Sequence, residues 1–290
     1  MAESGLIIVD KPGEWTSHDV VAKMRRIAGT RRVGHAGTLD PMATGVLVVG
    51  VEKATRLLGH LTLTEKVYEA TIRLGVSTNT DDAEGEATAT ASASGVTAAE
   101  IHKGVAALTG EIMQIPPQVS AIKVNGQRAY KKARAGEEVE LSARPVTVRT
   151  FEVLDIRAHD DVVDVDAVVT CSSGTYIRAL ARDLGAALGV GGHLTRLRRT
   201  RVGPYDLSLA RTIEQLAEEC VILPIGEAVA AAFPRRDVTA EEARVIGHGG
   251  RLGAAGLGKG PIGVFGPEGE LLALVEEQGR VAKPVAVFVP

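Results

Sequence analysis

Cysteine is scarce in this sequence: Cys171 and Cys220 are the only two among 290 residues, and they lie far apart. Two cysteines alone cannot form a zinc cluster, and they indicate no disulfide framework. We therefore expect two buried thiols in a reducing cytosol. No metal-ligand spacing and no nucleotide-binding motif occurs, so we expect neither a metal nor a cofactor.

Long apolar runs are also absent. None approaches the ~18 residues that a membrane span needs. The first residues, Met1–Ser4, have no basic segment followed by an apolar stretch, so we expect no signal peptide. Hydrophobic residues make up 45% and charged residues 24%, which is typical of a soluble globular protein. The length favours two domains, and we expect a cytoplasmic protein without a membrane partner.

The chain has no overall excess of positive charge, because its formal net charge is −3. Basic residues nevertheless gather in three stretches that contain no acids, while acids concentrate at Asp81–Glu86. The stretches are Lys23, Arg25, Arg26, Arg31, Arg32; Lys123, Arg128, Lys131, Lys132, Arg134; and Arg196, Arg198, Arg199, Arg201. This distribution can bind a polyanion on one face. The alternative for each stretch is a solvated surface.

The segment Gly34–Gly45, which reads GHAGTLDPMATG, joins a basic helix to an apolar run. Three glycines in twelve residues indicate unusual backbone angles or a close approach to another group. We interpret the segment as a turn that contains both His35 and Asp40. Pro41 excludes Asp40 from the middle of a helix, which places a carboxylate on a stiff loop beside a buried strand.

Two other interpretations of this segment remain open. An aspartate before a proline commonly initiates a turn. A glycine-rich loop can also hold phosphate, although the P-loop lysine and the dinucleotide glycine spacing are both missing.

Alternation at period two predicts a strand over 67–75, with Tyr68, Ala70, Ile72 and Leu74 on its apolar face. A core tyrosine with a satisfied hydroxyl explains Tyr68 equally well. A second alternating strand over 162–171 leads through a turn into a helix that carries Arg178 in its first turn. A cation there opposes the helix dipole, which suggests a role in a site.

The pattern gives further local predictions. We expect Ser17 as a helix N-cap, a helix over 53–63, a mobile loop over 87–95 and mostly helix over 213–232. In the strand over 162–171, we interpret Asp164 and Asp166 as solvated. A basic, exposed helix is expected around 128–135.

The sequence pattern of the chain changes after Phe233-Pro234-Arg235-Arg236, where we place a domain junction. Residues 1–234 form the first predicted domain and residues 235–290 the second. Short apolar runs separated by glycine-containing turns predict strands at 262–265, 271–275 and 285–289. The second domain is therefore expected to be a small β-barrel or curled sheet.

Four ordered segments of the chain, around Lys11, Asp40, Tyr68 and Arg178, resemble the TruB family of tRNA pseudouridine synthases. The twelve residues of Gly34–Gly45 resemble the catalytic motif of this family, and this match is specific for the family even without the others. Supporting matches are Asp10-Lys11-Pro12 with Thr16–Val21, Pro116–Gly126, and Gly174-Thr175-Tyr176-Ile177-Arg178. A leucine-arginine-arginine segment at 197–199 and the position of the C-terminal domain agree with the resemblance.

The resemblance implies a fold and an activity. The fold is mixed α+β: a central, largely antiparallel sheet flanked by helices, followed by a small β-rich PUA-type RNA-binding domain. The activity is isomerisation of the uridine at position 55, in the T loop of tRNA, to pseudouridine. The implied partner is the tRNA T stem-loop, with no obligate protein partner.

The resemblance also implies residue roles. Asp40 is the nucleophile, Arg178 pairs with it, and Tyr68 meets the flipped uracil. Lys11 and Pro12 are structural supports. The expected RNA contacts come from His35, which fills the vacated stack, and Leu197, which closes the pocket, together with Tyr176, Lys123, Lys131, Lys132, Arg196 and Arg198.

A rival hypothesis is a non-catalytic RNA-binding or RNA-folding protein on the same scaffold. The basic stretches fit it equally well, but binding does not require Asp40, Tyr68 and Arg178 together. Among catalytic routes, Asp40 could attack the sugar, attack the base, or remove a sugar proton by way of a glycal.

Overall fold

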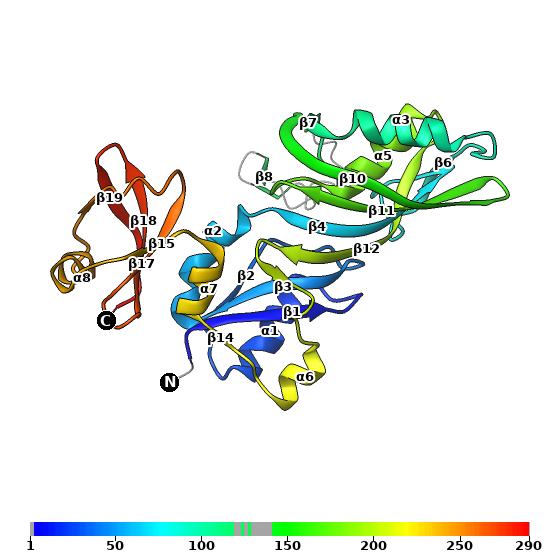
Figure 1. The fold of residues 1–290 in the computed structure, drawn as a ribbon. Helices are drawn as coiled ribbons and strands as arrows, with labels where there is room; N and C mark the ends of the chain where they lie inside the picture. Colours follow the sequence, from blue (N-terminus) through cyan, green and yellow to red (C-terminus); the bar gives the residue numbers. More distant parts are fainter. Residues whose placement is uncertain (1–2, 119–122, 125–126, 129–140, 290) are drawn as a thin grey trace. The chain divides into compact units, whose positions relative to one another are not determined.

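The computed structural model describes residues 3–118, 123–124, 127–128 and 141–289 (Figure 1). The chain forms two compact units. The first consists of Met1–Asp40, Gly45–Leu63 and Val202–Pro290, and the second of Pro41–Thr44 and Thr64–Arg201. Within the described ranges, every helix is too short or too polar to cross a membrane.

In the first unit, one antiparallel sheet has the strand order β14-β1-β3, and β2 also pairs with β3. Both long strands are buried along almost their whole length, which explains why their sequences are nearly continuous apolar runs. The strands are β1 (Gly5–Lys11), β2 (Val33–Ala36), β3 (Thr44–Val51), β13 (Tyr205–Asp206) and β14 (Leu223–Pro224). The helices are α1 (Ser17–Ile27), η1 (Glu52–Leu57), α2 (Leu58–Thr62), α6 (Ile213–Glu218) and α7 (Ile225–Ala232).

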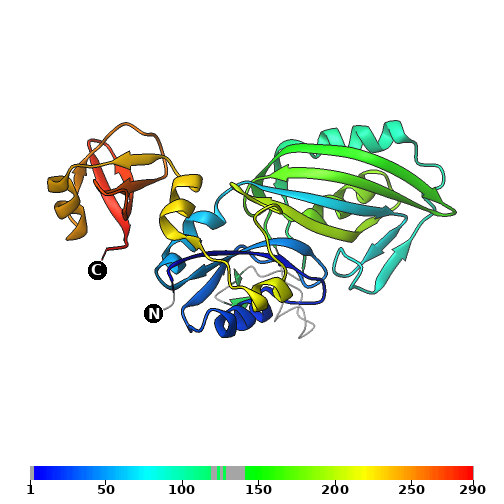
Figure 2. The same ribbon diagram turned by 60° about the horizontal axis from the view of Figure 1, so that its bottom comes forward.

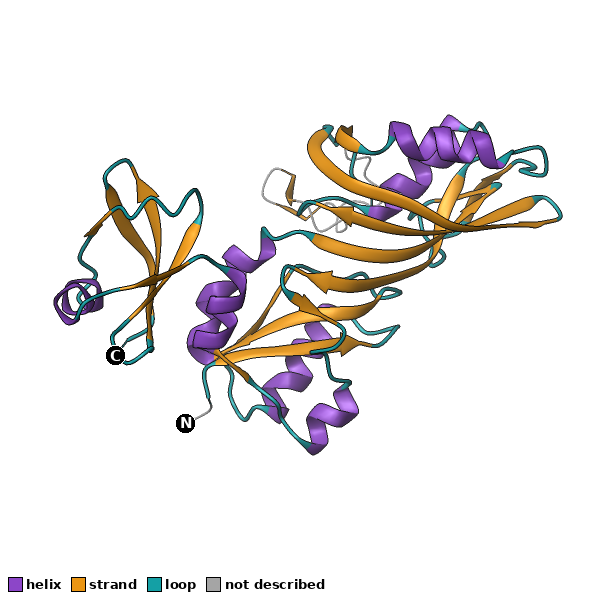
Figure 3. Cartoon of the chain, in the orientation of Figure 1, coloured by secondary structure: helices purple, strands orange, loops and turns teal. Residues whose placement is uncertain are grey.

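The end of the chain forms a five-stranded sheet in the order β15-β17-β18-β19-β16, with the helix α8 beside it (Figure 3). Its elements are β15 (Arg235–Asp237), α8 (Ala240–Gly247), β16 (Leu252–Gly253), β17 (Pro261–Phe265), β18 (Leu271–Gln278) and β19 (Val281–Val287). Val238, Ile246, Val264 and Val275 belong to a core of its own. The predicted small β structure is therefore present.

A second core connects this C-terminal sheet to the rest of the first unit. Phe265, Leu271 and Phe288 pack in one buried cluster with Leu6 and Val229. The Lys53 ammonium of η1 donates to the Phe288 carbonyl oxygen at 2.7 Å. The C-terminal sheet is thus fixed to the strands and helices before it, and the boundary at 234/235 stays a prediction.

The second unit is built on an antiparallel sheet with the order β12-β4-β11-β10-β7. Helices α3 and α5 contact each other, and α3 packs against β10 while α5 packs against β4 (Figures 1 and 2). The sheet strands are β4 (Lys66–Leu74), β7 (Gly110–Gln114), β10 (Arg144–His159), β11 (Val162–Cys171) and β12 (Gly192–Val202). The remaining elements are β5 (Val76–Thr78), β6 (Ala87–Thr90), α3 (Ala98–Ala107), β8 (Lys123–Val124), β9 (Gln127–Arg128) and α5 (Ile177–Ala187).

Helices and largely antiparallel sheets in both units confirm the predicted mixed α+β class. Several local predictions were wrong. Ala87–Thr90, expected in a mobile loop, is the strand β6, because it pairs with β5 in a two-stranded ribbon. The expected helix over 53–63 is a 3₁₀ helix followed by the short α2. The segment over 213–232 is mostly helical as expected, because it contains α6 and α7 with the short β14 between them. Cys220 is exposed, whereas Cys171 is buried as expected.

Asp164 is not a solvated strand position. Its strand β11 lies between β4 and β10, and its register partner on β4 is Arg73. The Arg73 guanidinium donates two hydrogen bonds to the Asp164 carboxylate, at 2.8 and 2.7 Å, which lowers the pKa of Asp164. Asp166 is likewise held, by Thr71 at 2.6 Å and Arg157 at 2.6 Å. Side chains of neighbouring strands therefore pair with the acids on this polar face of the sheet. The alternation of polar and apolar residues along one strand cannot reveal such pairs.

Candidate functional site

Lys11 ends β1 and is completely buried. Its ammonium donates to the carbonyl oxygens of Pro12 at 2.8 Å and Trp15 at 2.6 Å. A buried ammonium needs such acceptors, because burial without partners is costly. The lysine therefore fixes the turn between β1 and α1, and the supporting role that the resemblance implies for Lys11 and Pro12 stays a prediction.

Helix α1 begins with a capping box and not with a Ser17 cap. Thr16 is the N-cap, its hydroxyl accepts the Asp19 N–H at 3.1 Å, and the Asp19 carboxylate accepts the Thr16 N–H at 2.9 Å. Ser17 is the first helical residue and is buried, and its hydroxyl binds the backbone of Leu39. Its hydroxyl accepts the N–H of Leu39 at 2.9 Å and donates to the carbonyl oxygen of Leu39 at 3.2 Å.

Asp40 lies on the loop between β2 and β3, directly after the residue that Ser17 holds. Leu39 is 3% exposed and Ala43 is fully buried, so apolar anchors flank the partly exposed Asp40. Gly37, the first residue of the loop, and Gly45, the second residue of β3, have φ of 78° and 99°, which L side chains rarely adopt, so glycine is favoured at both positions. Asp40 is therefore presented on a restrained loop, as the sequence predicted.

His35 is not part of a turn. It lies on β2 opposite Val49 of β3, because β2 pairs with the neighbouring strand up to Ala36. Its ring meets the ring of His18, from α1, edge to face, with centroids 5.7 Å apart and an interplanar angle of 79°. The imidazole is thus mounted on a strand and supported from the side by a helix residue.

Tyr68 lies on β4 opposite Val169 of β11 and is 7% exposed. Ala70, Ile72 and Leu74 of the same strand are buried too, as the alternation predicted. Lys66 precedes it on this face and is 5% exposed. Burial, reinforced by repulsion from Arg199, lowers the pKa of the Lys66 amine to about 8.

Arg178 is the second residue of α5 and is 4% exposed. Its guanidinium donates to the Thr80 carbonyl oxygen at 2.8 Å and lies 3.4 Å from the carboxylate of Asp82. Asp82 is 2% exposed and also accepts the Glu84 N–H at 3.1 Å. A buried cation that opposes the helix dipole thus has a buried anion to stabilise it.

Sequence reasoning missed Asp82. The sequence shows it only as one of the acids concentrated at Asp81–Glu86, and nothing in a run of acids distinguishes the buried one. The turn also holds Asp81, whose carboxylate pairs with Arg182 of α5 at 3.1 Å. Burial raises the pKa of Asp81, and the charge of Arg182 opposes that change.

Strand β12 carries the predicted RNA-contact residues Arg196, Leu197 and Arg198. Leu197 is buried at 6% exposure. The Arg196 side chain is 58% exposed and pairs with Glu69 at 3.1 Å, while Arg198 donates to the Thr44 hydroxyl at 3.2 Å. Thr44 is the first residue of β3 and directly follows the loop that contains Asp40.

Other predicted contacts lie elsewhere in the second unit. Tyr176 is the N-cap residue of α5. Lys123 lies on the short strand β8, which pairs with β9. Lys131 and Lys132 lie outside the described residues, as do positions 129–135 of the predicted helix, whereas Arg128 belongs to β9. In the ranges that the structure describes, no three histidine, cysteine or acidic side chains come together in a way that could hold a metal ion.

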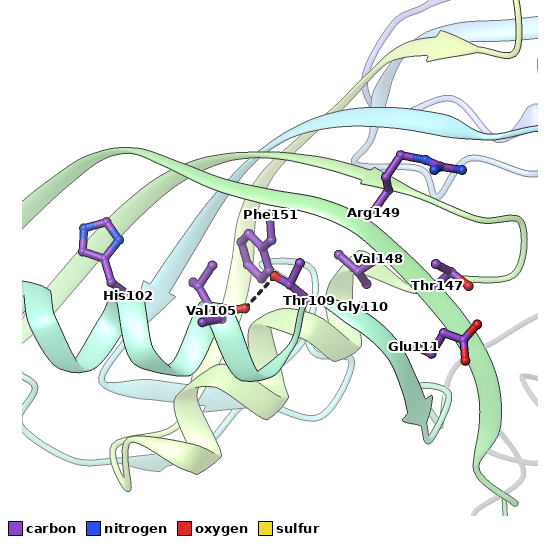
Figure 4. Close-up of a pocket in the computed structure, with 10 residues that line it drawn as sticks. His102, Val105, Thr109, Gly110, Glu111, Thr147, Val148, Arg149 and Phe151 are labelled. Carbon is purple, nitrogen blue, oxygen red and sulfur yellow. Dashed lines mark hydrogen bonds between the residues drawn. The ribbon is translucent and has the colours of Figure 1, made fainter.

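A shallow groove of about 570 Å³ lies between α3, β7 and β10, and contains none of the predicted site residues (Figure 4). His102, Glu111 and Arg149 give it polar groups, and Val105 and Phe151 give it apolar ones. The Thr109 hydroxyl donates to the Val105 carbonyl oxygen at 2.9 Å, which closes the end of α3. The groove thus offers mixed surface without a charge cluster.

Comparison with known families gives three consecutive matches. Residues 25–177 match the TruB family pseudouridylate synthase N-terminal domain. Residues 178–229 match the tRNA pseudouridylate synthase B C-terminal domain, and residues 233–289 match the C-terminal part of tRNA pseudouridine synthase II.

Curated relatives are similar over nearly the whole chain. The tRNA pseudouridine synthase B of Thermobifida fusca is 65% identical over 288 residues, which cover 98% of each chain. The protein of the same name from Streptomyces griseus is 63% identical over 289 residues, covering 98% of this chain and 97% of the relative.

Solved structures with the same architecture come from larger assemblies. A chain of a Cbf5-Nop10-Gar1 complex is 29% identical, with a TM-score of 0.76, and the match covers 99% of this chain and 85% of that one. A chain of an H/ACA RNP bound to a substrate RNA containing 2′-deoxyuridine is 28% identical, with a TM-score of 0.74 and the same coverage.

Proposed function

The chain belongs to the TruB family and is a tRNA pseudouridine synthase, and from this premise we propose that its target is the uridine at position 55 in the T loop. The proposal includes extrusion of the target nucleotide and Asp40 as the nucleophile. One observation supports Asp40 as the nucleophile: it directly follows Leu39, whose backbone N–H and carbonyl oxygen are both bound by the Ser17 hydroxyl, and both Leu39 and Ala43 of its loop are buried.

The reaction is an isomerisation. The bond between N1 of uracil and C1′ of the ribose breaks, the uracil turns, and a bond forms between C5 and C1′. The hydrogen at C5 leaves as a proton and N1 receives one, so atoms and electrons balance without an oxidant. An ionised Asp40 serves each of the three routes: attack on the sugar, attack on the base, or removal of a sugar proton.

A nucleophilic carboxylate must be ionised, and burial alone would oppose ionisation. We propose that Arg178 supplies the positive charge that keeps Asp40 ionised and oriented during the reaction. The support is the fixed position of the guanidinium, which Thr80 and Asp82 hold inside the second unit. Asp82 would then be a positioning residue, because it restrains Arg178 without meeting the base.

Base extrusion explains the other predicted residues. The atoms that react are hidden while the uridine is stacked, so the nucleotide must leave the stack. We propose that His35 fills the vacated position with its imidazole plane. Tyr68 would stack on the uracil, with its hydroxyl available for proton transfer, and Leu197 would exclude water. Both side chains come from strands of a packed sheet, which suits rigid positioning.

Phosphate contacts are proposed for Arg196 and Arg198, which lie on β12. Tyr176, Lys123, Lys131 and Lys132 complete the proposed RNA contacts. The curated relatives bear the name of a tRNA pseudouridine synthase, which supports tRNA as the substrate. We propose that the chain needs no obligate protein partner and that it acts in the cytoplasm.

Tritium release tests the activity. Transcribed tRNA labelled with ³H at C5 of uridine loses label only where C5 becomes the glycosidic carbon. We expect the wild type to release one equivalent, and to release none from a tRNA with cytidine at position 55. Release from that control tRNA would contradict the proposed target.

The variant Asp40→Asn tests the nucleophile. It is expected to bind tRNA within about threefold of wild type and to lose at least about a thousandfold in turnover, since an amide is a poor nucleophile at neutral pH. Turnover near the wild-type rate would exclude Asp40 as the nucleophile. A wild type that binds correctly folded tRNA but releases no label would support the rival RNA-binding function.

A further inference from the structure

Helix α5 begins without a cap from its own sequence. Its N-cap residue is Tyr176, whose side chain makes no capping hydrogen bond, and its first turn contains no acid. The first turn does contain Arg178, whose charge opposes the helix dipole. The start of this helix is therefore locally unfavourable, and something outside it must hold Tyr176.

Gln114, at the end of β7, holds it. The side-chain amide nitrogen of Gln114 donates to the Tyr176 carbonyl oxygen at 3.1 Å, and its amide oxygen accepts the Tyr176 N–H at 2.8 Å. Gln114 is 2% exposed. A primary amide supplies a donor and an acceptor side by side, so the two bonds together define its orientation.

A second contact joins the same two segments. The guanidinium of Arg182, one turn after Arg178, donates to the carbonyl oxygen of Ile115 at 2.8 Å. Consecutive residues at the end of β7 are thus attached to α5 on both sides of Arg178. The helix can neither unwind at its first turn nor slide along β7 without breaking one of these contacts.

We infer that Gln114 is a positioning residue that sets the first turn of α5 and thereby directs the Arg178 guanidinium toward Thr80 and Asp82. Arg178 lies two residues after the residue that Gln114 holds, so a shift of the helix start moves its side chain directly. A displacement of about 1 Å in an active group is enough to slow catalysis strongly. This inference rests on the proposed role of Arg178.

The test is Gln114→Met, which keeps the length and removes both hydrogen bonds. In steady-state tritium release, kcat should fall about tenfold, corresponding to about 1.4 kcal/mol, while KM for tRNA stays within about twofold. The matched control is Gln215→Met in the capping box of α6, where the Gln215 side chain accepts the Thr212 N–H at 3.0 Å. It should lower the melting temperature and leave kcat unchanged.

A double-mutant cycle distinguishes positioning from general stability. If Gln114 acts through Arg178, adding Gln114→Met to Arg178→Lys should slow the reaction by less than about twofold. Multiplicative losses, an unchanged kcat in Gln114→Met, or an equal loss in Gln215→Met at the same melting temperature would each overturn the inference.

If Gln114→Met does not fold, Gln114→Glu replaces it in the same cycle, because it keeps the acceptor for the Tyr176 N–H. A wild type that releases no tritium refutes the proposed function. An active wild type with an unaffected Gln114 variant refutes only the positioning role.

Discussion

Helices α1 and α5 each begin beside a residue proposed to act in the reaction, but their first turns are built differently. Helix α1 caps itself through Thr16 and Asp19, and its first residue, Ser17, binds the backbone of Leu39 in the loop of Asp40. Helix α5 has no cap of its own and is held by Gln114, which lies 62 residues earlier than Tyr176. One start is specified locally, whereas the other depends on the folded sheet.

The difference shows how a residue that opposes helix formation can be kept at a helix start. Arg178 weakens the first turn, and a local acid that compensated it would compete with Asp82 for the guanidinium. A neutral amide from another strand stabilises the turn without offering a competing charge. The three predictions that follow test this contrast, beginning with the largest expected effect.

The largest effect is expected from Arg178→Met. It leaves the buried Asp82 carboxylate without its cation, which should lower the free energy of unfolding by about 3–5 kcal/mol. Turnover should fall about a thousandfold or more. Chemical denaturation and tritium release measure the two losses separately.

Its control is the double variant Arg178→Met/Asp82→Leu. Replacing both charges by apolar groups should recover most of the stability and none of the turnover. Recovery of turnover would show that Arg178 serves folding alone.

An intermediate effect is expected at the start of α1, where Ser17→Ala and Thr16→Ala separate two roles. Ser17→Ala removes both bonds to Leu39, leaving its backbone groups without this partner, and should lower kcat about tenfold. Thr16→Ala removes the cap, which should cost about 1 kcal/mol of stability with kcat within about twofold of wild type.

Single-turnover rates and melting temperatures of the two variants provide the check. Equal rate losses at equal melting temperatures would mean that the Ser17 contact contributes nothing to the loop beyond stability.

The smallest effect concerns pH. Hydrogen bonds from the Thr16 side chain and backbone lower the pKa of Asp19, so its folded pKa is below its unfolded value. The stability from this carboxylate is present above the unfolded pKa and is lost as pH falls through the folded pKa. The difference in melting temperature between wild type and Thr16→Ala should therefore shrink below about pH 4.

The two hydrogen bonds between Gln114 and the Tyr176 backbone involve no acidic group, so the difference in melting temperature between wild type and Gln114→Met should stay constant over the same range. Melting curves between about pH 3 and 7 measure both differences. If the difference for Gln114→Met also shrank below about pH 4, the start of α5 would not depend on the Gln114 amide alone.

The errors of the sequence predictions have a common origin. Alternation placed Tyr68 correctly, because period two reports which face of one strand is buried. It could not place Asp164, whose exposure depends on Arg73 in a strand 91 positions away. His35 was assigned to a turn because glycines surround it, but pairing with β3 makes it a strand residue.

The site divides in the same way. The motif around Asp40 and the helix that carries Arg178 were visible in sequence, because a stiff loop and a misplaced charge leave local signs. Asp82 and Gln114 were not, since their importance comes from the partners that they meet. An acid in an acidic run and a glutamine at a strand end have no local distinction.

By itself, the sequence determined the family, the α+β class, the restrained loop of Asp40 and the cation in the first turn of α5. Tertiary structure decided which acid meets Arg178, which amide holds Tyr176, and how the short segment 87–90 becomes a strand. The physical reason is the range of the interactions. Backbone preference and periodicity act within a few residues, whereas burial and hydrogen bonding between distant segments exist only after the chain has folded.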